Sequence, residues 1–316
     1  MPYKIIFAGS PELAVPTLNA LVQSEHEILA VYTQPDRRGG RGRREFIKSP
    51  VKLAAEQHDL IIEQPESLKE LSAQEKLFSY GADVFIVLGY GIILPENVLN
   101  NFSLGGINPH VSLLPKWRGA APIQRAIEAG DSETGVSIMQ MDKGVDSGPV
   151  FLQASTPIDI NDSSADVHER LAAISANALI DVLTQIENGT AVKTPQDESF
   201  ATYAKKITKS EGEIIWSDPA LMIHNKIRAF NPWPIAFCDW FDESLRIWKS
   251  EYLVQASDLK PGTIVNIEKN AIDIACGENI LRLLEVQPAG KKCIGISDFS
   301  NSRKDKLIVG SCFGSN

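Results

Sequence analysis

Residues 106–122 read GINPHVSLLPKWRGAAP, a short apolar strand followed by a turn rich in glycine and proline. Asn108 and His110 are two positions apart, so their side chains point to the same side of an extended backbone. An amide that donates hydrogen bonds and an imidazole that titrates near neutral pH therefore share one face. Pro109 cannot donate to a sheet ladder, which predicts that the pair lies at a strand end. Open parallel sheets bind their ligands at strand ends.

The sequence on both sides of this stretch alternates between apolar strands and amphipathic helices. Near-continuous hydrophobic runs such as residues 83–88 are typical of parallel strands covered on both faces. The pattern predicts a Rossmann-like, mostly parallel α/β sheet, and the absence of G-x-G-x-x-G after the first strand argues against a dinucleotide-binding fingerprint. We expect strands at 4–9, 28–33, 60–63, 83–88, 134–141 and 150–158, and helices at 13–22, 49–58, 67–79, 122–129 and 165–187.

The chain changes character after residue 189. Residues 190–208 are rich in threonine, lysine and proline and are expected to form a linker, so the predicted domains are 1–189 and 209–316. The second domain begins with a helix near 218–229, and its short alternating strands predict a small antiparallel barrel. These strands are expected at 235–241, 245–249, 263–267, 271–275, 280–286 and 306–309.

Composition excludes several classes of protein. The chain has 316 residues, of which 43% are hydrophobic, and no uncharged apolar run approaches the roughly 18 residues of a membrane span. Strand-like sequence near the N-terminus leaves no room for a targeting peptide, so we expect a cytoplasmic protein of bacterial type. Cysteine spacing lacks C-x-x-C, which predicts reduced packing thiols and no metal site. The four cysteines are Cys238, Cys276, Cys293 and Cys312.

Positive charge is concentrated in one segment of an acidic protein. The net charge of −9 argues against a general nucleic-acid binder. Residues 34–48 nevertheless carry six cations among glycines, without apolar periodicity. This segment is either a solvated linker or a flexible arm that contacts phosphates, and its concentration of charge favours the arm. Its arginines are Arg37, Arg38, Arg41, Arg43 and Arg44.

Asp146, in the turn 142–148, can complete a reactive set with Asn108 and His110. If the three converge, the amide can hold a developing oxyanion, the imidazole can take a proton and the carboxylate can orient it. No activated serine or cysteine elbow is present, so the set suits direct transfer of a one-carbon acyl group to an amine. Considered alone, a single histidine is more often structural, and an aspartate in an Asp-Ser-Gly turn is more often a turn former.

Several motifs together give the chain a family resemblance. Residues 108–115 with 116–122 resemble the signature of the 10-formyltetrahydrofolate-dependent formyltransferases. The chain is most similar to the members of this family that act on methionyl-tRNA, nearly from end to end. The further motifs that carry the resemblance are FAGSP (7–11), TQPDR (33–37), GRG (40–42), SPVK (49–52), GVSIMQMD (135–142) and IRAFNPWP (227–234).

The resemblance implies a catalytic trio of Asn108, His110 and Asp146. It also implies that 10-formyltetrahydrofolate is the co-substrate and that no metal is needed. The residues expected to line the folate pocket are Gly89, Tyr90, Gly91, Ile92, Ile93, Ser112, Leu113, Leu114 and Pro115.

The acceptor implied by the resemblance is initiator methionyl-tRNA, formylated for translation initiation by a monomer. The basic arm would meet the acceptor stem, with Arg41 matching the key arginine of the family, and the C-terminal barrel would be an OB-like module lying along the tRNA. Three lysines near the linker are either phosphate contacts or ordinary solvated side chains. They are Lys205, Lys206 and Lys209.

Other functions remain open at this point. A formyltransferase for amino-sugars or nucleotides, or a formyltetrahydrofolate hydrolase, would share the core motif but would not need the basic arm. A non-catalytic RNA-binding module is a rival from another class, against which the intact trio argues.

Overall fold

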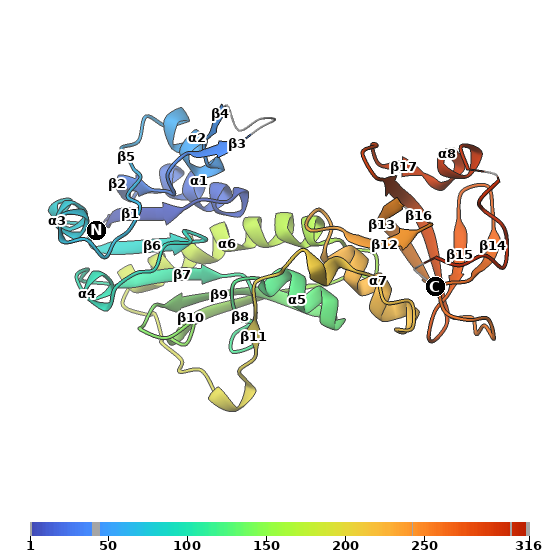
Figure 1. Ribbon diagram of the computed structural model, residues 1–316. Helices are drawn as coiled ribbons and strands as arrows, with labels where there is room; N and C mark the ends of the chain where they lie inside the picture. The colour runs from blue at the N-terminus through green and yellow to red at the C-terminus, as the bar shows by residue number, and fades with distance from the viewer. Residues whose placement is uncertain (1, 40–44, 242, 304, 314–316) are drawn as a thin grey trace. The chain divides into compact units, whose positions relative to one another are not determined.

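The computed structural model describes residues 2–39, 45–241, 243–303 and 305–313 (Figure 1). The chain folds into two compact units that interleave along the sequence. The first unit contains Met1–Pro122, Thr134–Thr156 and His168–Ala204, and the second contains Ile123–Glu133, Pro157–Val167 and Lys205–Asn316. The expected domain division at residue 189 stays a prediction.

The first unit is built on a seven-stranded sheet of order β10-β9-β7-β6-β1-β2-β5. The pairs β2–β5, β1–β2, β1–β6 and β6–β7 are parallel, whereas β7 and β9 are antiparallel. The expected mostly parallel α/β class is therefore confirmed. The strands are β1 (Lys4–Gly9), β2 (Glu27–Tyr32), β5 (Ile62–Glu63), β6 (Val84–Leu88), β7 (Gly106–His110), β9 (Glu133–Gln140) and β10 (Val150–Pro157).

Local sequence explains these elements. All five residues of β6 are buried, as expected for an apolar run in a sheet covered on both faces. Ser49 begins the next helix as predicted, because its hydroxyl accepts a hydrogen bond from the backbone N–H of Lys52 at 3.0 Å. The helices are α1 (Val15–Gln23), α2 (Pro50–Gln57), α3 (Leu71–Ser79), α4 (Glu96–Leu99), α5 (Pro122–Ala129) and α6 (Ser164–Glu187).

The basic arm is more regular than its composition indicated. Strands β3 (Arg37–Gly39) and β4 (Glu45–Ile47) pair in antiparallel fashion, so the expectation of irregular chain was wrong on both flanks. The guanidinium of Arg38 lies 5.7 Å from the centroid of the Phe46 ring, and such a cross-strand contact stabilises a short hairpin. Arg41, Arg43 and Arg44 lie outside the described residues.

The second unit has an antiparallel sheet of order β12-β13-β16-β15-β14, with β17 paired to β16. Its core includes Trp240, Ile247, Leu283 and Phe299, all almost fully buried. The expected antiparallel C-terminal domain is therefore confirmed. The elements are α7 (Ala220–Ala229), β12 (Ala236–Trp240), β13 (Glu243–Leu253), β14 (Ile264–Ile267), β15 (Ile272–Ala275), β16 (Ile280–Pro288), β17 (Ile294–Gly295) and α8 (Ile296–Asn301).

One predicted strand of this unit is wrong. Residues 306–309 form no strand: Lys306 and Val309 lie in turns, and the N–H groups of Lys306 and Leu307 both donate to the carbonyl of Arg303. Only Leu307 of the apolar run is buried, whereas Ile308 and Val309 are exposed. The run has apolar composition without the alternation that a half-buried strand requires.

Part of the expected linker joins the first unit. Strand β11 (Tyr203–Ala204) pairs in parallel with β8 (Arg118–Gly119), and β8 lies near the end of the 106–122 stretch. A Cβ on Gly119, whose φ is +113°, would lie 2.9 Å from the carbonyl oxygen of Ala204, so this close approach requires glycine. None of the helices in the described ranges combines the length and apolarity that crossing a membrane requires.

Candidate active site

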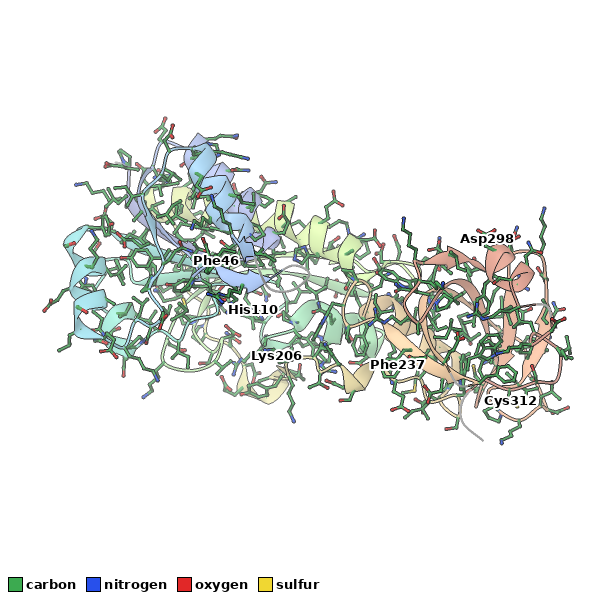
Figure 2. All side chains as sticks on the ribbon, turned by 45° about the horizontal axis from the view of Figure 1, so that its top comes forward. Phe46, His110, Lys206, Phe237, Asp298 and Cys312 are labelled. Carbon is green, nitrogen blue, oxygen red and sulfur yellow. The ribbon has the colours of Figure 1, made fainter. Side chains whose placement is uncertain are left out.

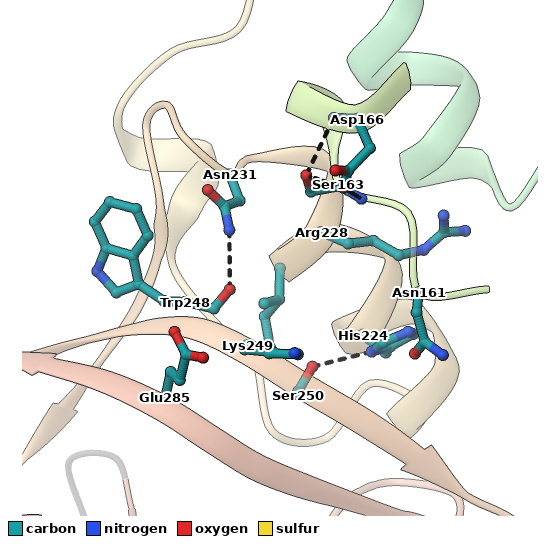
Figure 3. A pocket seen from close by; sticks show the side chains of 11 residues that line it. Asn161, Ser163, Asp166, His224, Arg228, Asn231, Trp248, Lys249, Ser250 and Glu285 are labelled. Atoms are coloured by element: carbon teal, nitrogen blue, oxygen red, sulfur yellow. Dashed lines mark hydrogen bonds between the residues drawn. The ribbon is translucent and has the colours of Figure 1, made fainter. Parts of the chain in front are cut away.

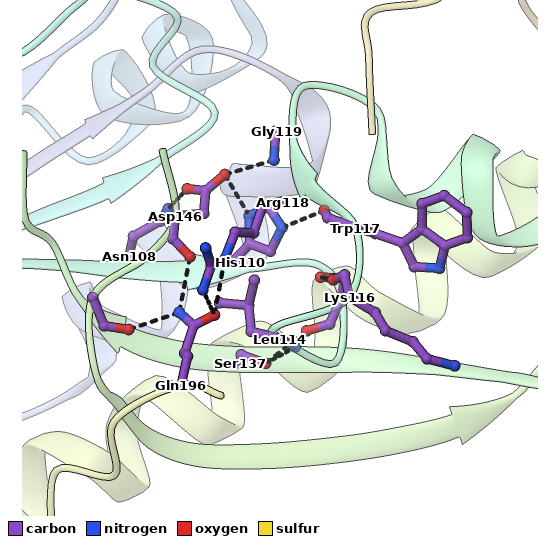
Figure 4. Close-up of polar contacts among 12 residues, drawn as sticks. Asn108, His110, Leu114, Lys116, Trp117, Arg118, Gly119, Ser137, Asp146 and Gln196 are labelled. Carbon is purple, nitrogen blue, oxygen red and sulfur yellow. Dashed lines mark hydrogen bonds and ion pairs between the residues drawn. The ribbon is translucent and has the colours of Figure 1, made fainter. Parts of the chain in front are cut away.

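The side chains of Asn108, His110 and Asp146 meet in the first unit (Figure 4). Asn108 and His110 lie on β7, and Asp146 lies in the loop between β9 and β10. His110 Nδ1 is 3.6 Å from Asp146 Oδ2, and Asn108 Nδ2 is 3.4 Å from Asp146 Oδ1. Asp146 has a φ of +49°, a left-handed conformation that aspartate tolerates better than most residues. The structure thus brings together all three residues of the expected trio.

The contacts of His110 indicate which ring nitrogen carries a hydrogen. The residue is 6% exposed, and Nε2 lies 3.0 Å from the carbonyl oxygen of Trp117. A carbonyl only accepts hydrogen bonds, so we place the hydrogen on Nε2. The lone pair of Nδ1 then faces the side of Asp146, and a proton taken up at Nδ1 would be stabilised by that carboxylate.

Asp146 is fixed by the turn that follows the 106–115 part of the motif. The N–H of Gly119 donates to Asp146 Oδ2 at 2.8 Å, which leaves the other oxygen facing the Asn108 amide. The 3.4 Å contact is long for a hydrogen bond, and an amide nitrogen carries two hydrogens. Asn108 therefore retains a donor for a substrate oxygen.

The nine residues expected to contact folate divide into three groups by their exposure. Gly89, Gly91 and Ile93 are exposed, and both glycines have positive φ, so this loop presents backbone and aliphatic surface to solvent. Ile92, Leu113 and Pro115 are partly buried. The buried members shape the chain: Ser112 Oγ donates to the Lys116 carbonyl at 2.7 Å. The buried residues are Tyr90, Ser112 and Leu114.

The residues expected to contact RNA are exposed where they are described. Arg37 and Arg38 lie on β3, and Arg37 donates to the side-chain oxygen of Gln34. Lys205 and Lys206 follow β11 directly, and the Lys206 side chain is visible in Figure 2. Lys209 is exposed as well. These side chains can therefore reach a polyanion.

Sequence reasoning missed a polar clamp made by Arg118, Gln196 and Glu198. The Arg118 side chain is 2% exposed and forms a two-pronged ion pair with Glu198 at 2.8 and 2.9 Å. The Glu198 carboxylate raises the pKa of Arg118, so the guanidinium stays charged. Nε and one terminal nitrogen of Arg118 donate to Gln196 Oε1 at 3.1 and 2.9 Å.

Gln196 passes this restraint to the loop of Asp146. Its amide nitrogen donates to the carbonyls of Asp146 at 2.8 Å and Gly148 at 2.7 Å (Figure 4). The only local signal was Arg118 within the motif. Gln196 lies in a stretch with the composition of a linker, and nothing near it in sequence predicts a partner 50 residues away.

Replacing Gln196 by leucine is expected to lower the turnover number of the expected formyl transfer about 10- to 100-fold, because misplacing a reacting group by roughly 1 Å has effects of that size. The backbone of Asp146 loses its restraint, whereas Asn108 and His110 keep theirs. Steady-state kinetics should show the loss in kcat, with KM for the expected folate co-substrate nearly unchanged. Gln255→Leu, at an exposed position of the second unit, is the matched control. An unchanged kcat for the Gln196 variant would contradict this positioning role.

A cavity of about 230 Å³ lies within the second unit (Figure 3). Nδ1 of His224 lies 3.0 Å from Ser250 Oγ, and Nε2 lies 2.8 Å from the carbonyl oxygen of Ile160. Burial lowers the pKa of His224, which favours the neutral ring. Asn231 donates to the carbonyl of Trp248 at 3.1 Å. These hydrogen bonds connect residues 157–167 with α7 and β13, so the groups have a structural role.

Comparison with known proteins gives two family matches along the chain. The formyl transferase family matches residues 3–183, and the C-terminal domain of formyl transferases matches residues 206–304. A methionyl-tRNA formyltransferase of Coxiella burnetii (strain RSA 493 / Nine Mile phase I) is 49% identical over 310 residues, which cover 98% of each chain.

Solved structures show the same fold at low identity. The N-formyltransferase of Helicobacter canadensis, in a complex with folinic acid and dTDP-3-aminofucose, has a TM-score of 0.67 at 19% identity, covering 91% of this chain and 100% of its own. HypX of Aquifex aeolicus, in a complex with tetrahydrofolic acid, has a TM-score of 0.64 at 14% identity, covering 95% of this chain and 47% of its own.

Proposed function

The chain belongs to the formyl transferase family, and from this premise we propose that it transfers the formyl group of 10-formyltetrahydrofolate to the α-amine of methionyl initiator tRNA. The observation that carries the proposal is the meeting of Asn108, His110 and Asp146, in a chain 49% identical to a methionyl-tRNA formyltransferase. The product is formylmethionyl-tRNA, the aminoacyl-tRNA with which translation begins.

The proposed chemistry is direct acyl transfer. The amine attacks the formyl carbon, and the oxygen of the tetrahedral intermediate takes up negative charge beside the Asn108 amide. His110 Nδ1 accepts the proton of the attacking nitrogen, and Asp146 stabilises the resulting imidazolium. Breaking the bond between the formyl carbon and the folate nitrogen releases tetrahydrofolate, whose nitrogen takes the proton back. Atoms and charge balance without a covalent enzyme intermediate.

The assay that tests the function compares acceptors. The protein is incubated with 10-formyltetrahydrofolate and either charged initiator or charged elongator methionyl-tRNA, and formylmethionine is measured after deacylation. We expect formylmethionine from the initiator. Preferred formylation of a free amino-sugar or nucleotide, or hydrolysis of the donor alone, would replace this proposal by one of those functions.

We assign the folate-binding role to Gly89–Ile93 and Ser112–Pro115, and the RNA-binding role to the basic arm with Lys205, Lys206 and Lys209. Exposed backbone and aliphatic groups in the 89–93 loop, and exposed cations near β11, support these roles. We further propose that residues 1–189 act as the catalytic domain, 190–208 as linker and 209–316 as an OB-like RNA-binding domain. The family matches at 3–183 and 206–304 support this division.

We also propose that the protein acts as a monomer in the cytoplasm, where its tRNA substrate is charged and used, and without binding a membrane. Light scattering after gel filtration should give a mass near 34.6 kDa. A mass twice as large would contradict the monomer.

Removing the charges of Arg41, Arg43 and Arg44 together is expected to raise KM for the tRNA by roughly 10- to 100-fold at moderate salt, since each lost phosphate contact weakens binding. Folate binding should stay normal, because the donor does not need the arm. Initial rates at varied tRNA measure the effect. The triple variant Lys4→Ala/Lys69→Ala/Lys76→Ala removes the same charge from exposed positions of the first unit, outside the proposed RNA-binding domain. An equal rise in KM for the tRNA in both triple variants would show that overall charge, and not the basic arm, causes the effect.

A further inference from the structure

The second unit carries an open groove of about 600 Å³, which shares Trp248 with the cavity of Figure 3 but is otherwise lined by different residues. It lies between the turn Pro232–Pro234 and the outward face of β12 and β13. Its volume falls within the range of roughly 300–1,000 Å³ that is usual for ligand sites. The lining residues that carry the argument are Lys209, Trp233, Phe237, Arg246 and Trp248.

Aromatic rings form much of this groove. Trp233 is 48% exposed, a large exposed fraction for a tryptophan, whereas Phe237 and Trp248 are partly buried. Along β13, Leu245 and Ile247 point into the core, so Arg246 and Trp248 point outward. Trp248 is held in place, because its Nε1 donates to Gln287 Oε1 at 3.0 Å. The groove therefore offers aromatic faces in a defined arrangement.

Positive charge accompanies the rings. Arg246 lies directly across from Phe237 in the register of β12 and β13, so a cation and an aromatic ring are neighbours on one face. Among the described residues that line the groove, Lys209 and Arg246 are the charged ones, and both are exposed. A groove with aromatic faces and cations suits a ligand that has flat rings and negative charges.

We propose, on the basis of the proposed function, that this groove binds an unpaired nucleotide of the tRNA substrate. The base stacks on the exposed ring of Trp233, and Lys209 and Arg246 contact the neighbouring phosphates. Stacking on aromatic side chains with cations along the backbone is how proteins bind unpaired RNA, and the strand face of small antiparallel barrels is a common place for it. An acidic protein partner could use the cations but would gain little from a stacking platform.

The test measures binding of uncharged initiator tRNA to the full-length protein, without folate, by filter binding at several salt concentrations. Trp233→Ala is expected to weaken binding about 5- to 100-fold, the usual effect of losing one stacked base, whereas Trp233→Phe restores most of it. Arg246→Ala is expected to lower the slope of log affinity against log salt by about 1, because one phosphate contact is lost. The slope for Trp233→Ala should match the wild type.

Phe241→Ala is the matched control, because Phe241 is a 52% exposed aromatic residue of the same unit outside the groove. Its tRNA affinity should equal that of the wild type. Unchanged affinity in Trp233→Ala together with an unchanged salt slope in Arg246→Ala would overturn the inference. The salt slope of Arg246→Ala decides the question even if Trp233→Ala fails to fold.

The two proposals fail separately. A wild type that formylates methionyl-tRNA while both groove variants bind tRNA normally would overturn only the groove. A wild type that binds tRNA through the groove but produces no formylmethionine would overturn only the proposed function.

Discussion

His110→Ala is expected to lower kcat for formyl transfer by about 10²- to 10⁴-fold, the usual contribution of a general base. The variant loses Nδ1, whose lone pair faces Asp146 Oδ2 at a distance of 3.6 Å. The proton of the attacking amine then has no acceptor inside the site. KM for both substrates should change little, because the imidazole acts on the reacting nitrogen. Single-turnover measurements at saturating substrate isolate this step.

His58→Ala is the matched control for the histidine. His58 lies at the end of α2, is exposed, and bonds to Asn19 at 3.0 Å, away from the trio. Its variant should keep the wild-type rate. If His110→Ala turned over like the wild type, the general-base assignment would be wrong, and a non-catalytic RNA-binding function would regain support.

Asn108→Asp is expected to lower kcat by at least about 10²- to 10³-fold, which is the effect of removing one oxyanion donor. The substitution keeps the size of the side chain, replaces the amide donor by an acceptor, and places a second carboxylate near Asp146, where the present contact is 3.4 Å. The negative oxygen of the intermediate would then meet repulsion where it needs a hydrogen bond.

Comparing Asn108→Asp with Asn108→Ala separates these effects. The alanine variant loses the donor alone and should be the faster of the two, although still far below wild type. Asn101→Asp makes the same chemical change at an exposed position and should leave the rate unchanged. Equal single-turnover rates for wild type and Asn108→Ala would show that the amide does not serve the oxyanion.

Much of the fold could be predicted because its signals are local. The apolar runs of β1 and β6 identify buried strands by composition alone, and the Ser49-Pro50 pair marks the start of α2. The strand at 306–309 was predicted wrongly because a short apolar run fits a turn as well as a strand.

Only the part of the site that lies on one strand, β7, could be predicted from the sequence. Asn108 and His110 share a face because β7 is extended, and that follows from their spacing. The position of Asp146 depends on contacts that Arg118 and Gln196 make across the fold. The sequence near these two residues does not indicate those contacts. Long-range polar contacts have no sequence period, so pattern reasoning cannot detect them.

The pairing of β8 with β11 fixes the length of the chain between Gln196 and Tyr203, which lies inside the first unit. Gln196 holds the Asp146 loop, and Tyr203 lies in register with Arg118, so the stretch between them spans a set distance. Loops between secondary-structure elements usually tolerate insertions and deletions. The addition or removal of one residue here would break either the hydrogen bonds of Gln196 or the register of β11 with β8. Natural variation in chain length should therefore occur before residue 196 or after residue 204 and leave that span constant.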